Sequence, residues 1–330
     1  AMLRRLITAA EDITIKGYDD KMAAEELLDY AEGDIFRIAQ KRQRNDYAKI
    51  QDVLMKNLRI IDQAVQNKGQ VIGLPTGFKQ LDEKTSGLQP SDLIIVAARP
   101  GMGKTAFALN IAQQSAVKAG ASVLIFSLEM SQEQLGQRLI AMQARVESEK
   151  LKKGTLDLKD WDRINFALNE LNNTKIVIDD TPGISIMEMR NKCRRLKAEQ
   201  GLDLIVVDYL QLMTFDGRAD SRQQEISALS RHLKLLAREM NCPVIVLSQL
   251  SRAPELRQDK RPMLSDLRES GSIEQDADIV MFLYRDDYYN ENTEKPGVCE
   301  INIAKHRSGP TDRIDLTWVA RYTKFSDKAL

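Results

Sequence analysis

Short apolar runs alternate with helical patterns from residue 71 to the end of the chain. The runs lack polar alternation, which is typical of strands buried on both faces of a sheet. The predicted strands are Leu93–Ala98, Ser122–Leu128, Lys175–Ile178, Leu204–Val207, Val244–Leu247, Ile279–Leu283, Cys299–Ile303 and Ile314–Leu316. The predicted helices are Thr105–Ala119, Ser131–Arg145, Ile184–Glu199 and Gln223–Met240. This order predicts an α/β fold with a mostly parallel twisted sheet between helices.

Residues 1–70 have a different texture, charged, poor in glycine and helical in pattern. Lys49–Lys68 carries apolar residues at three- and four-residue spacing and meets Gly69 as a stop signal. A shorter helix is predicted over Asp34–Arg42, with Asp34 as its cap. The apolar content is too small for a separate core, so we expect these helices to dock elsewhere. The predicted domains are therefore 1–70, helical, and 71–330, α/β.

Charge balance narrows the classes of function. The 330 residues carry 48 Lys and Arg against 48 Asp and Glu, a formal net charge of zero. This excludes a strongly basic whole-molecule field as the basis of nucleic-acid binding. Three widely spaced cysteines give no zinc-ligand spacing and favour a reducing, cytoplasmic setting. No apolar run approaches the roughly 20 residues of a membrane span.

A phosphate-binding loop follows the first predicted strand, in the stretch Ala98-Arg-Pro-Gly-Met-Gly-Lys-Thr105. Gly101 and Gly103 let backbone amides approach phosphate oxygens, and the following helix turns its amino end toward them. Lys104 suits the β- and γ-phosphates of ATP, and the Thr105 hydroxyl suits Mg²⁺. The alternative is a glycine-bearing turn with a chance Lys-Thr pair. The predicted nucleotide-binding residues are Arg99, Pro100, Gly101, Met102, Gly103, Lys104, Thr105 and Ala106.

Three further polar residues end predicted strands, where ligands bind in open α/β sheets. Asp208 follows four apolar residues and is the candidate second Mg²⁺ ligand, the alternative being a cap for the next turn. Glu129 is the candidate general base, unless it and Ser131 merely begin a helix. Gln249 can hydrogen-bond to γ-phosphate or water and so sense the nucleotide, or simply end its strand as a polar residue.

Seven motifs occur in the order found in DnaB-type replicative DNA helicases. They are AARPGMGKTAFALNIA, IFSLEMS, DDTPG with KCRRLK, LIVVDYLQLM, SQLSR, DLRESGSIEQDADIV and KHRSGPT. The resemblance covers most of residues 71–330. It implies a RecA-like P-loop NTPase that assembles as a homohexamer and moves 5′ to 3′ on single-stranded DNA at the replication fork. Residues 1–70 resemble the end of the N-terminal region with its linker helix, so most of the collar domain is expected to be missing.

The resemblance also implies partners and trans-acting residues. Lys305 and Arg307 would contact the nucleotide of a neighbouring copy, whereas the sequence alone favours a solvated basic turn. His306, between them, receives no catalytic role. A helicase loader and primase are the implied protein partners, the primase through the absent collar.

The implied DNA contacts lie in Arg268-Glu269-Ser270-Gly271, whose arginine and amides can hold phosphates without reading bases. Arg252 is a further candidate for the same channel. The basic residues of 190–197 spread around a helix, so a solvated face or an interface is favoured there over DNA binding. Two other functions stay open: a nucleotide-gated DNA-binding and loader-docking module, and a recombinase or clock-type ATPase, against which the LEMS, SQLSR and RESG motifs argue.

Overall fold

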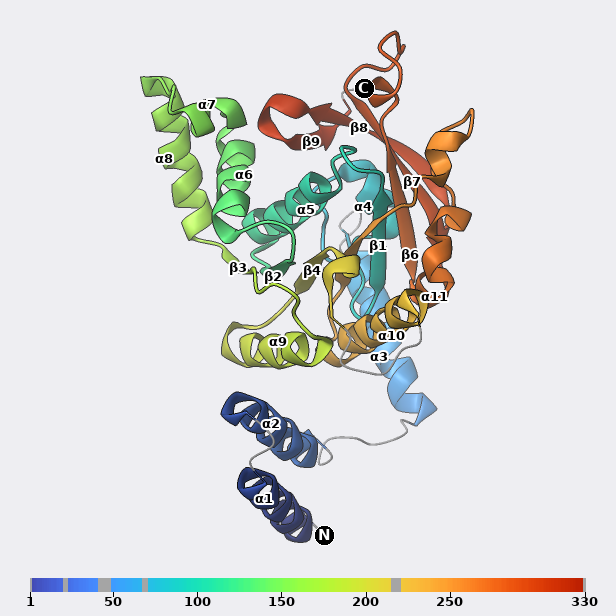
Figure 1. The fold of residues 1–330 in the computed structure, drawn as a ribbon. Helices are drawn as coiled ribbons and strands as arrows, with labels where there is room; N and C mark the ends of the chain where they lie inside the picture. The colour runs from blue at the N-terminus through green and yellow to red at the C-terminus, as the bar shows by residue number, and fades with distance from the viewer. Residues whose placement is uncertain (1, 20–22, 41–48, 67–70, 215–220, 329–330) are drawn as a thin grey trace. The chain divides into compact units, whose positions relative to one another are not determined.

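The computed structural model describes residues 2–19, 23–40, 49–66, 71–214 and 221–328 (Figure 1). The chain divides into two compact units, Ala1–Gln70 and Val71–Leu330. The first unit contains α1 (Met2–Tyr18), α2 (Ala24–Gln40) and α3 (Ile50–Gln66). The Tyr30 hydroxyl donates to Asp12 at 2.5 Å, and the Lys16 ammonium lies 3.4 Å from the Tyr30 ring centroid. These contacts join α1 to α2.

One helix boundary in the first unit was predicted wrongly. The helix expected to begin at Asp34 begins ten residues earlier, at Ala24, so Asp34 lies inside α2 and is not its cap. Asp34 misled the prediction because aspartate favours caps, but Ala24, Leu27, Leu28 and Ala31 already continue the helical pattern before it. The α3 prediction is confirmed over Ile50–Gln66.

The second unit is built on a nine-stranded sheet in the order β3-β2-β4-β5-β1-β6-β7-β8-β9. The pairs from β3 through β6 are parallel, and the pairs from β6 through β9 are antiparallel. The strands are β1 (Leu93–Ala98), β2 (Ser122–Ser127), β3 (Lys175–Asp179), β4 (Leu204–Asp208), β5 (Val244–Gln249), β6 (Ile279–Tyr284), β7 (Val298–His306), β8 (Asp312–Val319) and β9 (Lys324–Asp327).

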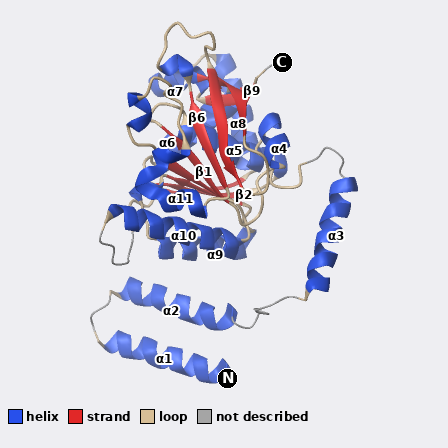
Figure 2. Cartoon of the chain, turned by 90° about the vertical axis from the view of Figure 1, so that its right-hand side faces the viewer, coloured by secondary structure: helices blue, strands red, loops and turns tan. Residues whose placement is uncertain are grey.

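Helices cover both faces of this sheet, as Figures 1 and 2 show for α5 on one side and α9 and α10 on the other. Phe107 of α5 packs in the core that includes Val96, and Leu233 of α10 packs in the core that includes Ile95. Neighbouring residues of β1 thus serve opposite cores, as the strand period of two requires. The α-helices are α4 (Lys79–Thr85), α5 (Lys104–Ala119), α6 (Gln132–Ala144), α7 (Ser148–Lys153), α8 (Leu158–Asn172), α9 (Ile186–Gln200), α10 (Arg222–Met240) and α11 (Gly271–Asp276).

The predicted fold class is confirmed, with every predicted strand present. The predictions did not include β9 or the helices α1, α4, α7, α8 and α11. Helix α8 starts with a capping box between Asp157 and Asp160, a signal readable in the sequence. Strand β9 has four residues and pairs only with β8, so its short sequence carries too little pattern to predict.

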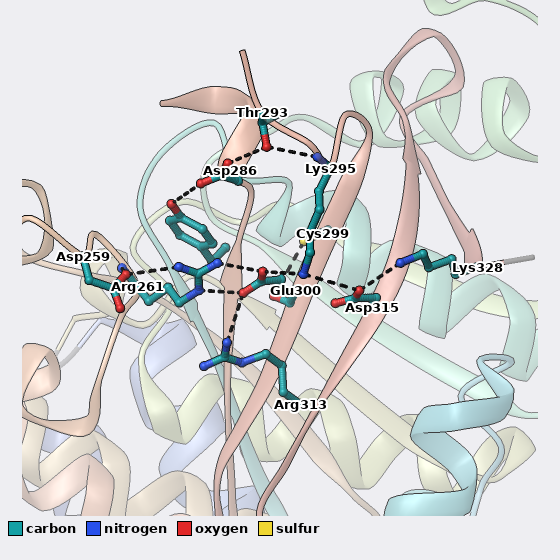
Figure 3. A network of polar contacts seen from close by, with 11 residues as sticks. Asp259, Arg261, Asp286, Thr293, Lys295, Cys299, Glu300, Arg313, Asp315 and Lys328 are labelled. Carbon is teal, nitrogen blue, oxygen red and sulfur yellow. Dashed lines mark hydrogen bonds and ion pairs between the residues drawn. The ribbon is translucent and has the colours of Figure 1, made fainter. Parts of the chain in front are cut away.

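A buried glutamate joins the antiparallel strands to the segment before them (Figure 3). The Glu300 side chain on β7 is 4% exposed and accepts two hydrogen bonds of 2.8 Å from Arg261. Lys295 lies 3.4 Å and Arg313 3.5 Å from the same carboxylate. The Arg261 hydrogen bonds hold the pKa of Glu300 below its ordinary value, although burial opposes them. This pairing satisfies a charge that burial alone would destabilise.

Candidate nucleotide and DNA sites

The loop between β1 and α5 has the geometry of an anion cradle. Gly101 and Gly103 adopt positive φ angles of 79° and 95°. A Cβ at Gly101 would lie 2.8 Å from the Tyr288 ring, and one at Gly103 would lie 2.9 Å from the Phe325 ring. Gly103 is the N-cap of α5 and offers no side-chain cap. The first amides of α5 therefore keep their hydrogen-bonding capacity for a bound anion.

Thr105 and Asp208 meet beside this loop. The Thr105 hydroxyl donates to Asp208 Oδ2 at 2.7 Å, which ties the start of α5 to the end of β4. Asp208 is 3% exposed, and its Oδ1 is buried without a hydrogen-bond partner among the described residues. Burial raises the pKa of Asp208, while Thr105 and Lys104 oppose that shift. Asp208 does not cap the following 3₁₀ helix, Leu210–Leu212, whose N-cap is Tyr209 without a side-chain bond.

Glu129 and Lys104 complete this cluster. Ser127, the last residue of β2, pairs in register with Asp208, and the Leu128 amide donates to the Asp208 carbonyl at 2.7 Å. Glu129 therefore stands just beyond the level of Asp208. Helix α6 is capped by Ser131 with Gln134, so Glu129 is not needed for that cap. Burial lowers the pKa of Lys104, and the negative charges of Asp208 and Glu129 counteract it.

Arg138 of α6 is a cluster residue that the sequence reasoning missed. It lines a cavity of about 430 Å³ together with Glu129, Gln134 and Lys152. Burial lowers the pKa of Arg138, opposed by the charges of Asp208 and Glu129. The sequence signal was weak, since one arginine inside a helix resembles any surface cation. Only the return of α6 toward β2 brings it to the phosphate site.

Gln249 lies at the end of β5, in register with Ala98 at the start of the phosphate loop. Its side chain is exposed. The Gln211 side chain holds the backbone here. Its Nε2 donates to Ser248 Oγ at 3.0 Å and to the Gln249 carbonyl at 3.3 Å. Its side-chain oxygen accepts from the Gln249 amide at 3.4 Å. Gln211 therefore fixes the backbone from which the Gln249 side chain projects.

Further groups surround the loop. Arg99 donates to Glu255 at 3.0 Å and to the Leu250 carbonyl at 2.8 Å. Its guanidinium therefore joins the phosphate loop to the segment after β5. Arg285, also missed from the sequence, donates to the Gly101 carbonyl at 3.3 Å and lies 5.4 Å from the Trp318 ring. Arg285 and Trp318 lie far from the phosphate loop in sequence, so no local motif predicts their position beside it.

Lys305 and Arg307 lie at the opposite edge of the sheet. His306 pairs with Ile279, the first residue of β6, and Ile279 pairs with Ile94 near the start of β1. The phosphate loop leaves the other end of β1. Four residues of strand separate the two levels, about 13 Å. The basic pair is thus remote from the phosphate loop of its own chain. Both side chains bond to their own chain and do not form the freely solvated turn that the sequence alone favours.

The candidate DNA contacts are described only in part. Arg268 and Glu269 lie in the 3₁₀ helix Leu264–Ser270, but their side chains fall outside the described residues. Gly271 opens α11. Arg252 is exposed after β5. In the basic cluster of α9, Arg190 and Arg194 pair with Glu239, Lys192 pairs with Asp179, and Lys197 donates to a carbonyl. These pairings favour the interface or surface interpretation of that cluster over DNA binding.

The sheet order, the anion cradle and the Thr105–Asp208 contact define a RecA-like P-loop NTPase. The site fits Mg²⁺: Asp208 Oδ1 is a buried oxygen without a partner, and hydroxyl and carboxylate oxygens are the donors this ion prefers. Among the described residues, no group of three or more His, Cys, Asp or Glu side chains could hold a metal ion by itself. The described helices include none with the length and hydropathy of a membrane span.

Comparison with known proteins identifies the family. Residues 73–327 match the DnaB-like helicase C terminal domain. The chain is 53% identical over 326 residues to replicative DNA helicase DnaC of Bacillus subtilis (strain 168), covering 98% of this chain and 72% of that protein. It is 51% identical over 326 residues to replicative DNA helicase DnaB of Geobacillus stearothermophilus, with the same coverage. The chain belongs to the DnaB-like replicative DNA helicases, which are ATP-dependent enzymes.

Two solved structures agree with this assignment. One is an isolated ATPase domain that is 40% identical with a TM-score of 0.81, covering 86% of this chain and 100% of that one. The other is a DnaB-like replicative helicase, solved in a study of its interactions with primase. It is 37% identical with a TM-score of 0.85, covering 99% of this chain and 76% of that one. The resemblance inferred from the seven motifs is thereby confirmed.

Proposed function

We propose that this chain is the motor of a homohexameric ring that hydrolyses ATP, moves 5′ to 3′ along single-stranded DNA and separates the duplex at the cytoplasmic replication fork. The observation that carries the ring is the separation of the two halves of the site. Lys104, Thr105 and Asp208 meet at one edge of the sheet, and Lys305 with Arg307 lies at the other. A second copy is needed to bring both halves to one nucleotide.

The described residues supply the chemistry of phosphoryl transfer to water. Lys104 and the α5 amides would hold the β- and γ-phosphates, within the nucleotide-binding stretch Arg99–Ala106. Thr105 and Asp208 would hold Mg²⁺, which when bound neutralises phosphate charge. Glu129 would orient and deprotonate the attacking water, and Arg138 would add positive charge from the same chain. Gln249 would report the presence of the γ-phosphate.

Arg268, Glu269 and Gly271, with Arg252, would line the channel that holds DNA phosphates. A channel that grips phosphates ignores base sequence, as a translocating motor must. A ring of copies concentrates these few cations around one strand, which explains how a chain of zero net charge can bind DNA. A helicase loader and primase are the proposed protein partners. The primase contact would lie in the N-terminal collar.

A forked DNA substrate tests this function. With ATP and Mg²⁺, assembled protein should release the labelled strand from a fork with a free 5′ tail. A biotin–streptavidin block on the 5′ tail should stop release, and the same block on the 3′ tail should not. Native mass spectrometry checks for hexamers. Hexamers that hydrolyse ATP without strand release would instead favour a nucleotide-gated DNA-binding and loader-docking module.

A further inference from the structure

The side chains of Lys305 and Arg307, the basic pair, are held by a short helix of their own chain. Lys305 Nζ donates to the carbonyl oxygens of Glu274 at 2.5 Å and Gln275 at 3.4 Å. Arg307 Nη2 donates to the Gln275 carbonyl as well. Both carbonyls belong to the last turn of α11, where the helix leaves its carbonyls without intrahelical partners. The basic pair therefore satisfies the carboxyl end of α11.

Asp278, two residues beyond α11, holds Arg307 by both backbone and side chain. The Arg307 amide donates to the Asp278 carbonyl at 2.9 Å, and Arg307 Nη1 lies 3.5 Å from Asp278 Oδ1. The Asp278 side chain is only 10% exposed. Its Oδ2 accepts from Lys234 Nζ of α10 at 2.5 Å and from the Leu93 amide at 2.8 Å. Because Lys234 and the Leu93 amide both hold the Asp278 carboxylate, it gives the Arg307 guanidinium a defined position.

The contacts of Lys305 and Arg307 with α11 and Asp278 are weak enough to be broken by a competing anion. The Arg307 side chain is 46% exposed, and ion pairs of such exposed groups shift an equilibrium by only about two- to fivefold. Burial and the like charge of Arg307 lower the pKa of Lys305. A triphosphate on a neighbouring copy offers several negative charges at once and can compete with carbonyl oxygens for both cations.

We propose that Asp278 and the carboxyl end of α11 form a resting site for the basic pair, which reaches a neighbour's nucleotide only by leaving that site. The inference rests on the proposed function, in which Lys305 and Arg307 act across an interface. Asp278 is then a positioning residue. Because α11 directly follows Arg268–Ser270, release of its carboxyl end links nucleotide engagement to the segment proposed to hold DNA.

Asp278→Asn tests the resting site. The substitution keeps the shape and an acceptor oxygen but removes the charge that attracts Arg307. Steady-state ATPase rates of the hexameric full chain are measured with and without a saturating 50-nucleotide dT strand. The DNA-free kcat should rise about two- to fivefold, while the DNA-saturated kcat and the KM for ATP change less than about twofold. DNA then stimulates the variant less than the unsubstituted protein.

Lys234→Met is the matched control. It breaks the same buried ion pair and should lower the thermal stability similarly, but it leaves Asp278 with Arg307 as its remaining cation. Its DNA-free kcat should stay level or fall. A fall in Asp278→Asn, or an equal rise in both variants, would overturn the resting site. Arg307→Ala separates the proposals: if it still hydrolyses ATP, the trans action itself is wrong, whatever Asp278→Asn does.

A measurement on the unsubstituted hexamer covers the case in which Asp278→Asn does not fold. Amide hydrogen exchange over residues 272–278 is compared with and without a non-hydrolysable ATP analogue. Departure of the basic pair removes bonds from the carboxyl end of α11, so exchange there should quicken at least about threefold. Unchanged exchange at full analogue occupancy would overturn the proposal.

Discussion

At the scale of single residues, two of the catalytic candidates are charged side chains that are buried beside other charged side chains. Asp208 and Lys104 lie in one buried cluster, where burial pushes the pKa of the acid up and that of the base down while their attraction opposes both shifts. Such opposed environments are typical of functional sites. Lys104 was predicted because a strand, a glycine-rich turn and a helix follow each other along the chain, and Asp208 because it follows four apolar residues of a strand. Arg138 was not predicted, because only the packing of α6 in the folded protein brings Arg138 to the cavity that Glu129 also lines.

Glu129→Gln should separate hydrolysis from binding. The amide keeps the size of the side chain but cannot accept a proton from water, so kcat should fall about 10²- to 10⁴-fold. ATP affinity, measured by isothermal titration calorimetry, should change little. Glu133→Gln, in the first turn of α6, is the matched control and should keep nearly full activity. A Glu129→Gln protein with normal kcat would remove Glu129 from the role of general base.

Asp92→Asn should stabilise the protein above pH 6. Burial and the charge of Asp278 raise the pKa of Asp92 from 3.8 to about 6. The folded state thus disfavours the ionised carboxylate, and this penalty is fully present above pH 6 and fades as the pH falls toward 3.8. The gain at pH 7.5 should be about 1–2 kcal/mol after allowance for solvent screening.

Urea unfolding between pH 4 and 8 measures that gain. The difference between Asp92→Asn and the unsubstituted protein should shrink as the pH decreases below 6. Asp162→Asn, an exposed position on α8, should show no such trend. A gain independent of pH would show that the charge of Asp92 is not its source.

At the scale of elements, the parallel strands position the nucleotide site, and the antiparallel strands place Lys305 and Arg307 at the other edge of the sheet. β1, β2, β4 and β5 end at one edge, where the phosphate loop, Glu129, Asp208 and Gln249 gather. β7 reverses direction and delivers the basic pair to the other edge. Eight of the strands were predictable because their short apolar runs lack polar alternation and are separated by helical patterns. Their order and direction were not, because pairing joins segments far apart in sequence.

Glu300→Gln should weaken the antiparallel part of the sheet. The substitution removes the buried carboxylate that accepts two hydrogen bonds from Arg261 and leaves Arg261 with Asp259 as its ion-pair partner (Figure 3). The free energy of unfolding should fall by about 2–4 kcal/mol, measured by urea denaturation at pH 7.5. Lys328→Ala, which removes an exposed ion pair with Asp315 in the same network, should cost less than about 1 kcal/mol. Equal losses in both would contradict the central role of Glu300.

At the scale of the whole molecule, zero net charge and a divided site both point to assembly. Neither half of the proposed site completes the other within one chain. The first unit leaves apolar residues of α3 such as Leu54, Leu58 and Ile61 exposed by 57%, 64% and 60%. We expect these exposed side chains to be the surface by which residues 1–70 dock elsewhere.

Mixing two inactive variants tests action across an interface. Lys104→Ala should abolish hydrolysis at its own site, and Arg307→Ala should abolish it at the neighbour's. In an equimolar mixed ring, about a quarter of interfaces join an intact Lys104 to an intact Arg307. ATPase activity should therefore recover to at most about a quarter of the unsubstituted rate. No recovery in rings shown by mass spectrometry to be mixed would contradict trans action.

The sequence by itself determined eight of the nine strands, the phosphate loop and the candidacy of Asp208 and Glu129, because each depends on neighbours along the chain. It also carried the motif order that identifies the family. Only the tertiary structure decided that Thr105 bonds Asp208, that Arg138 and Arg285 reach the nucleotide side, and that Lys305 and Arg307 face away from it. Those facts depend on strand order and helix packing, which non-local contacts fix.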